Sequence, residues 1–75
     1  MVKAIEMKTL EDVKRINRLA TKCNFDLFVD AGSIRIDAKS MLGLIILLNK
    51  PNLMLVAEDS VNAKEFAKIA SMATA

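Results

Sequence analysis

Ser40 is the side chain whose type and setting most readily suggest chemistry in this sequence of 75 residues. It lies between Lys39 and an apolar run beginning at Met41, where a helix is expected to start. A phosphate on such a serine would meet free backbone N–H groups and the positive end of the helix dipole, with the Lys39 ammonium beside it. An unmodified serine would instead be a helix cap, worth about 1 kcal/mol. The sequence leaves open whether Ser40 is a regulatory phosphorylation site or only a cap.

The groups that catalysis usually needs are missing from the rest of the chain. There is no histidine, and the lone Cys23 has no second cysteine with which to form a disulfide or a metal site. The sequence also lacks a glycine-rich phosphate loop, a carboxylate pair in an apolar setting and any metal-ligand spacing. We therefore expect a protein that is not an enzyme and that uses neither a metal nor a cofactor.

Composition indicates one small domain over residues 1–75, with a core of aliphatic side chains, because 53% of the residues are hydrophobic and only 4% aromatic. The net charge of +2 is spread along the chain without a basic stripe, so nucleic acid is not expected as a partner. The longest apolar stretch, residues 41–48, is far shorter than the roughly 18 residues of a membrane span. No signal-peptide pattern opens the chain, so we expect a cytoplasmic protein.

Hydrophobic periodicity predicts the order strand, helix, strand, strand, helix, strand, helix. A strand over residues 2–7 is followed by a helix that opens with a capping box of Thr9 and Asp12. Strands near residues 25–29 and 34–38 form a hairpin with its turn at residues 30–32, a short helix follows Ser40, and a strand covers residues 53–58. The last helix is expected to begin at Asp59 or Ser60.

The expected buried faces are Leu10, Val13, Ile16, Ala20 and Cys23 on the first helix, and Ala63, Phe66, Ala67, Ala70 and Ala73 on the last. The predicted fold class is α+β, a two-layer sandwich with helices on one face of an antiparallel sheet.

Two segments carry a resemblance to a known family in a single register. Lys39-Ser40-Met41-Leu42-Gly43-Leu44 resembles the Lys-Ser-Ile-Met-Gly-Val segment around the regulatory serine of HPr, the small phosphocarrier of the bacterial sugar phosphotransferase system. Ala20-Thr21-Lys22 is similar to the Ala-Ser-Lys stretch that leaves the first helix of that family. The resemblance implies an HPr-like open-faced sandwich with antiparallel sheet order 1-4-2-3, whereas a ferredoxin-like alternative would have the order 4-1-3-2.

The same register implies that the carrier site of the family is vacated in this chain. The phosphorylated histidine of the family falls at Thr9, and the arginine that steadies the phosphate falls at Glu11. Asp12 stands where the family has a proline, so this segment resembles an ordinary helix start. Histidine phosphotransfer is chemically impossible without an imidazole, and Thr9 is expected to act as a cap.

The apolar run after Ser40 predicts a partner surface, because a short helix on a sheet buries only one face. By the family resemblance, Met41, Leu42 and Ile45 would be the outward, docking side chains, and Leu44 of the same run is a further partner-binding candidate. The leading hypothesis is a non-catalytic HPr-like regulatory or binding module, whose partners would be phosphotransferase-system enzymes, a serine kinase or a transcriptional regulator. The alternative is a structural module in which the helix of residues 41–48 makes a homodimer or an assembly contact and Ser40 is only a cap.

Overall fold

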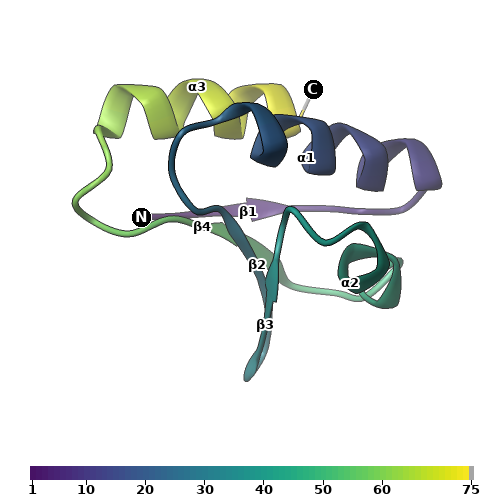
Figure 1. The fold of residues 1–75 in the computed structure, drawn as a ribbon. Coiled ribbons are helices and arrows are strands. Elements are labelled where there is room, and N and C mark those ends of the chain that lie inside the picture. The colour runs from purple at the N-terminus through teal and green to yellow at the C-terminus, as the bar shows by residue number, and fades with distance from the viewer. Residues whose placement is uncertain (75) are drawn as a thin grey trace.

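The computed structural model describes residues 1–74, which form a sheet with helices against one of its faces (Figure 1). The elements are β1 (Val2–Ile5), α1 (Leu10–Lys22), β2 (Phe28–Ala31), β3 (Ile34–Asp37), α2 (Met41–Ile46), β4 (Leu53–Val56) and α3 (Ala63–Ala73). The sheet is antiparallel, and its strands follow the order β1-β4-β2-β3. This order confirms the predicted fold class and differs from the ferredoxin-like alternative.

The helices divide between two positions on the sheet. α1 and α3 lie side by side in one layer, whereas α2 lies below the start of α1 and contacts both α1 and β3 (Figure 1). None of these helices, within residues 1–74, is long and apolar enough to cross a lipid bilayer.

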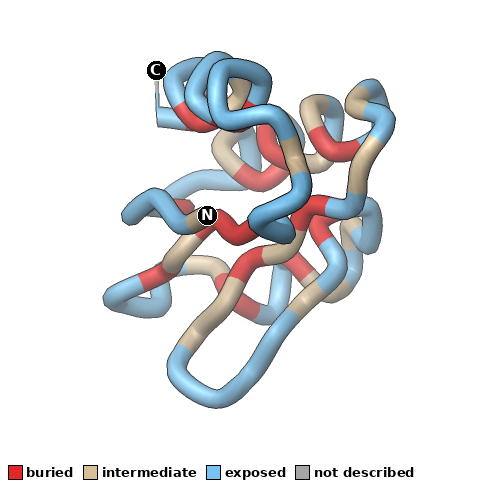
Figure 2. The backbone as a smooth tube through the Cα atoms, turned by 90° about the vertical axis from the view of Figure 1, so that its left-hand side faces the viewer, coloured by how far each residue is buried: buried red, intermediate tan, exposed pale blue. Residues whose placement is uncertain are grey.

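One hydrophobic core fills the space between the helices and the sheet (Figure 2). Every element except β3 contributes a buried side chain to it, and Ile36 of β3 is half-buried against it. Its fully buried members include Val13 and Ile16 from α1, Val29 from β2, Leu44 from α2 and Leu55 from β4. Aliphatic side chains dominate this core, as the composition predicted.

Some helical positions expected in the core are exposed. Leu10 is 49% exposed because, at 3.6 residues per turn, it lies about 90° from the middle of the stripe formed by Val13, Ile16 and Ala20. On α3, Ala67 is exposed for the same geometric reason, whereas Ala63 lies nearer the buried stripe but is exposed at the first position of the helix. Cys23 is only half-buried because it caps the end of α1.

Several boundaries also differ from the sequence-based expectation. β1, α2 and β4 each end two residues earlier than expected, and β2 covers Phe28–Ala31 instead of residues 25–29. The hairpin turns at Gly32 and Ser33, because Ala31 still pairs with Ile34 across β2 and β3. Gly32 has φ +61°, which suits the first central residue of a type II′ turn. The last helix is capped by Asn62, whose side-chain oxygen accepts hydrogen bonds from the backbone N–H groups of the first turn, and begins later than Asp59 or Ser60.

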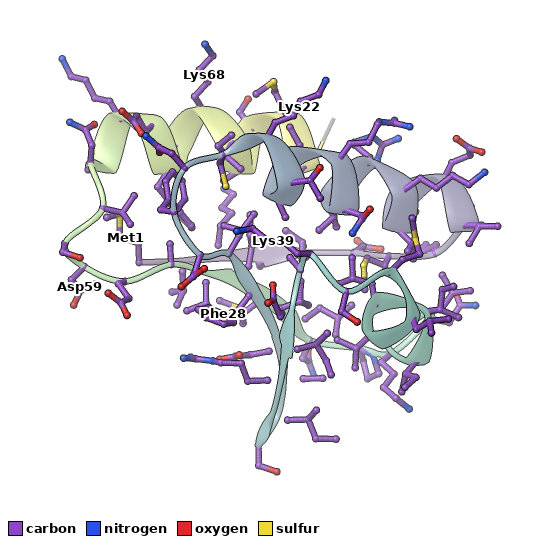
Figure 3. All side chains as sticks on the ribbon, viewed as in Figure 1. Met1, Lys22, Phe28, Lys39, Asp59 and Lys68 are labelled. Atoms are coloured by element: carbon purple, nitrogen blue, oxygen red, sulfur yellow. The ribbon has the colours of Figure 1, made fainter. Side chains whose placement is uncertain are left out.

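The sheet face away from the helices is partly covered by its own side chains. Arg35 on β3 makes two hydrogen bonds to the carboxylate of Asp30 on β2, at 2.8 and 2.9 Å. Its guanidinium also lies 5.2 Å from the centre of the Phe28 ring, a side chain labelled in Figure 3. The Arg35 guanidinium, held by Asp30, and the Phe28 ring together shield apolar surface on this face.

Candidate functional site

Ser40 is the N-cap of α2, as the sequence predicted for its structural role. Its Oγ accepts a hydrogen bond from the backbone N–H of Gly43 at 3.1 Å, and its carbonyl accepts one from the N–H of Leu44 at 3.0 Å. Its own N–H donates to the carbonyl of Asp37 at 2.9 Å, which joins the end of β3 to the start of α2. The residue is nonetheless exposed, so its hydroxyl is within reach of a modifying enzyme.

Lys39 is adjacent to Ser40 in sequence, but its ammonium is engaged elsewhere. Nζ lies 3.8 Å from a carboxylate oxygen of Asp26, and both side chains are largely exposed. In the view of Figure 3, the Lys39 side chain extends away from α2. An exposed pair at this distance contributes little to stability, so the ammonium is free to turn toward a phosphate on Ser40.

The outer side of α2 carries the most exposed apolar side chains of the candidate site. Leu42 is 78% exposed, Ile46 is 67% exposed and Ile45 is 39% exposed, while Met41 is half-buried. Leu42 and Ile46 are neighbours because they are four residues apart on the helix. We refer to Met41, Leu42, Ile45 and Ile46 as the α2 surface. It has no charged side chain, because none occurs within α2.

The structure corrects the membership of this surface at two positions. Leu44 was expected to bind a partner, but it is fully buried because it points into the core that α2 forms with the sheet and α1. Ile46 was not among the named candidates, although its spacing of four residues from Leu42 could have suggested it. Met41, Leu42 and Ile45 remain accessible, as expected.

Gly43 sets how closely α2 approaches the sheet. A Cβ atom at this position would lie 2.7 Å from Cγ2 of Ile36 on β3 and 3.1 Å from Oγ of Ser40. Contacts this short require a neighbour to move. Because Gly43 has no side chain, α2 can lie close to β3. The side of α2 that faces away from β3 is then in solvent.

The start of α1 is a complete capping box. The Oγ1 of Thr9 accepts a hydrogen bond from the N–H of Asp12 at 3.2 Å. In return, Oδ2 of Asp12 accepts from the N–H groups of Lys8 and Thr9, at 2.9 and 3.0 Å. Nη1 of Arg15 reaches the other oxygen of the same carboxylate at 3.0 Å. These backbone and guanidinium donors hold the pKa of Asp12 below its ordinary value.

This start of α1 offers nothing to an incoming phosphate. A hollow of about 470 Å³ lies beside it, but the two cations that line the hollow already face carboxylates: Lys8 pairs with Glu6 at 2.9 Å, and Arg15 pairs with Asp12. Glu11 is exposed and lies 3.7 Å from Lys14, so it adds a negative charge to the first turn of α1. The region contains no side chain that relays phosphoryl groups as an imidazole does.

The described residues also contain no cluster of three or more histidine, cysteine, aspartate or glutamate side chains that could hold a metal ion. The Cys23 thiol donates to the carbonyl oxygens of Ala20 and Phe25, at 3.4 and 3.2 Å, in keeping with a structural role at the end of α1. Comparison of the chain with protein-family models, with curated proteins and with solved structures found no match.

Proposed function

We propose that this protein is a non-catalytic binding module of the HPr type that docks a protein partner through the α2 surface. The observation that carries the proposal is the exposure of Leu42, Ile45 and Ile46, three large apolar side chains on one short helix. Support comes from the sheet order β1-β4-β2-β3, which is the order that the resemblance implies, and from the absence of any histidine in the sequence. A contiguous apolar surface on a small domain is a frequent mark of a binding site.

The size of the α2 surface favours a transient contact. It consists of four side chains from one helix of six residues, whereas a stable interface buries about 800 Å² from about 20 to 30 residues on each partner. A partner that covers the α2 surface must therefore also reach flanking residues or bind weakly. A permanent homodimer through α2 alone is the second candidate for the role of this surface. It ranks below a transient partner because two copies of the α2 surface would bury less area than a standard interface.

Phosphorylation of Ser40 is the regulatory part of the proposal. A phosphoserine there would place a charge of about −2 at the edge of the apolar α2 surface, next to Lys39. Such a change would weaken docking of an apolar partner and favour one that presents arginine or lysine. The partner classes that fit are a serine kinase, phosphotransferase-system enzymes and a transcriptional regulator in a bacterial cytoplasm.

Photo-crosslinking in the native cells tests the docking surface. A benzophenone side chain would replace Leu42 or Ile46 and, as the matched control, Leu10, which is also apolar and exposed but lies on α1. We expect adducts with another protein from positions 42 and 46 and none from position 10. Adducts whose mass is twice that of the chain would support the homodimer instead. The absence of adducts from positions 42 and 46, or equal adducts from position 10, would contradict both candidates.

Intact-mass spectrometry of the protein recovered from those cells tests the regulatory part separately. We expect one added phosphate that fragment mapping places on Ser40 and that the Ser40→Ala variant lacks. An unmodified mass under both sugar-rich and sugar-poor growth would leave Ser40 as a helix cap, and the α2 surface as a constitutive contact.

A further inference from the structure

A shallow groove lies where the end of α1 meets α3, well away from the α2 surface. It has a volume of about 350 Å³ and contains no residue of α2. Its apolar lining comes from Cys23 and Phe25, which follow α1, and from Ile69 and Met72 of α3. Cys23, Phe25 and Ile69 are half-buried against the core, and Met72 is 39% exposed. We refer to this feature as the α1–α3 groove.

The rim of the α1–α3 groove is cationic. Lys22 at the end of α1 and Lys68 on α3 both line it, and both side chains rise from the outer side of the helices, away from the sheet (Figure 3). Within residues 1–74, neither ammonium lies within 4.0 Å of a carboxylate. Their charges are therefore available to a ligand.

The neighbouring charges reinforce this pattern. Arg18 and Lys64 lie one helical turn before Lys22 and Lys68, and neither has an ion-pair partner among the described residues. Glu65 is the one carboxylate that lines the groove. Two cations and one anion line the groove, and the exposed Asp26 beside it lies 3.8 Å from Lys39. With Arg18 and Lys64 one turn away, this end of the helix layer has a local positive potential.

We propose that the α1–α3 groove binds an acidic peptide segment of a partner protein, with one apolar side chain of that segment against Ile69, Met72 and Phe25. Carboxylates on either side of this anchor would pair with Lys22 and Lys68. An apolar lining with a cationic rim is the complement of an apolar residue flanked by acidic ones. The groove is shallow and open to solvent, which suits an extended segment. Met72 adapts its shape to different anchors because its side chain is flexible.

Titration followed by ¹H–¹⁵N correlation spectra tests this site. The probe is a capped pentapeptide with one leucine flanked by two acidic residues on each side, and the control probe has lysines in place of those acidic residues. We expect the acidic peptide to shift the amides of residues 22–25 and 65–72, with a Kd of about 1 mM or lower. The control peptide should leave these amides in place.

Charge-reversal variants distinguish binding of the acidic peptide in the groove from its non-specific attraction to a protein with a net positive charge. Lys22→Glu combined with Lys68→Glu should weaken binding of the acidic peptide at least about tenfold. Lys22→Glu and Lys68→Glu are also compared singly with Lys50→Glu, which changes the net charge by the same two units. Lys50 is exposed in the loop after α2 and does not line the groove, so its reversal should change the Kd less than about twofold.

Three results would overturn the proposal: no amide shifts at about 5 mM acidic peptide, equal shifts with the lysine peptide, or shifts confined to residues of α2. Equal weakening by Lys50→Glu and by the groove variants would also overturn it. None of these outcomes bears on the crosslinks expected from the α2 surface, so the two binding sites can fail independently.

Discussion

Replacement of Gly43 by alanine should destabilise the protein, although alanine is the better helix former. The new Cβ would lie 2.7 Å from Cγ2 of Ile36 and 3.1 Å from Oγ of Ser40. The Ile36 methyl belongs to a β-branched side chain on β3, whose χ1 rotation is restricted, so it cannot turn aside without strain. One of the two elements must therefore shift.

The magnitude follows from two opposing effects. Alanine in place of glycine within a helix gains about 1 kcal/mol. Forcing an extra carbon into a packed contact costs about 1 to 3 kcal/mol. We expect Gly43→Ala to lower the free energy of unfolding by about 1 kcal/mol, a measurable part of the roughly 4 to 11 kcal/mol that a chain of this length has in total.

A second substitution at Ile36 makes this prediction specific. Ile36→Ala removes the methyl that would clash, so in that background Gly43→Ala should raise the free energy of unfolding, by about 0.5 kcal/mol. Ile36→Val is the matched control, because valine keeps the methyl branch, and there Gly43→Ala should still destabilise.

Urea unfolding followed by circular dichroism measures these differences, provided that the slope of the free energy of unfolding against urea concentration is the same for all variants. A change of sign between the alanine and valine backgrounds is the expected result. If Gly43→Ala has the same sign in both backgrounds, α2 is not held against β3 by the contact at Gly43, and the account of how the α2 surface is positioned fails.

Three further predictions test the site. Leu44→Ala should lower the free energy of unfolding by about 2 to 5 kcal/mol, and Leu42→Ala by less than about 0.5 kcal/mol, because Leu44 is fully buried and Leu42 is 78% exposed; equal losses in urea unfolding would contradict the assigned faces of α2. Ser40→Ala should cost about 1 kcal/mol through loss of the N-cap hydrogen bond, and an unchanged urea midpoint would show that the cap contributes nothing. The pKa of Asp12 is lowered by hydrogen bonds from backbone N–H groups and from Arg15, so its contribution is present above the unfolded-state pKa of about 3.9 and is lost as the pH falls through the lower folded-state pKa. Asp12→Asn should therefore reduce the difference in Tm between pH 7 and acidic pH, and an unchanged difference would contradict this assignment.

Much of the fold could be predicted from local patterns in the sequence. The capping box of Thr9 and Asp12, the spacing of Val13, Ile16 and Ala20 and the cap at Ser40 are all local signals, and each lies where it was expected. The sheet order is not a local signal. It was expected from the resemblance, because strand alternation does not state which strands are neighbours.

The α2 surface was predictable only in outline. Almost every residue of α2 is apolar, so periodicity could not separate the buried Leu44 from the exposed Leu42 and Ile46. That division depends on how closely α2 lies on β3, which the structure sets at Gly43. The start of α3 was misplaced for a different reason, since Asp59, Ser60 and Asn62 are all good caps and only packing selects among them.

The α1–α3 groove could not be found from the sequence. Lys22 and Lys68 belong to two helices that are far apart in the sequence. Phe25 and Met72 are ordinary core candidates when each is considered alone. No motif or spacing joins these residues, so their common setting is a property of the tertiary structure.

The central position of β4 also constrains how the chain can reach this structure. β4 pairs with β1 on one side and with β2 on the other. β1 is therefore joined to the β2–β3 hairpin within the sheet only through β4. Val2 pairs with Val56, so β1 emerges from the ribosome long before its partner and has no place in the sheet until β4 has been synthesised. Pairing of β1 with β4 closes the long segment of chain between them. Folding therefore depends on contacts between residues far apart in the sequence, and it should be slower than in a helical bundle of equal length. A chain cut in the loop before β4 would therefore leave two fragments that cannot complete the sheet separately, and that could regain it only by associating.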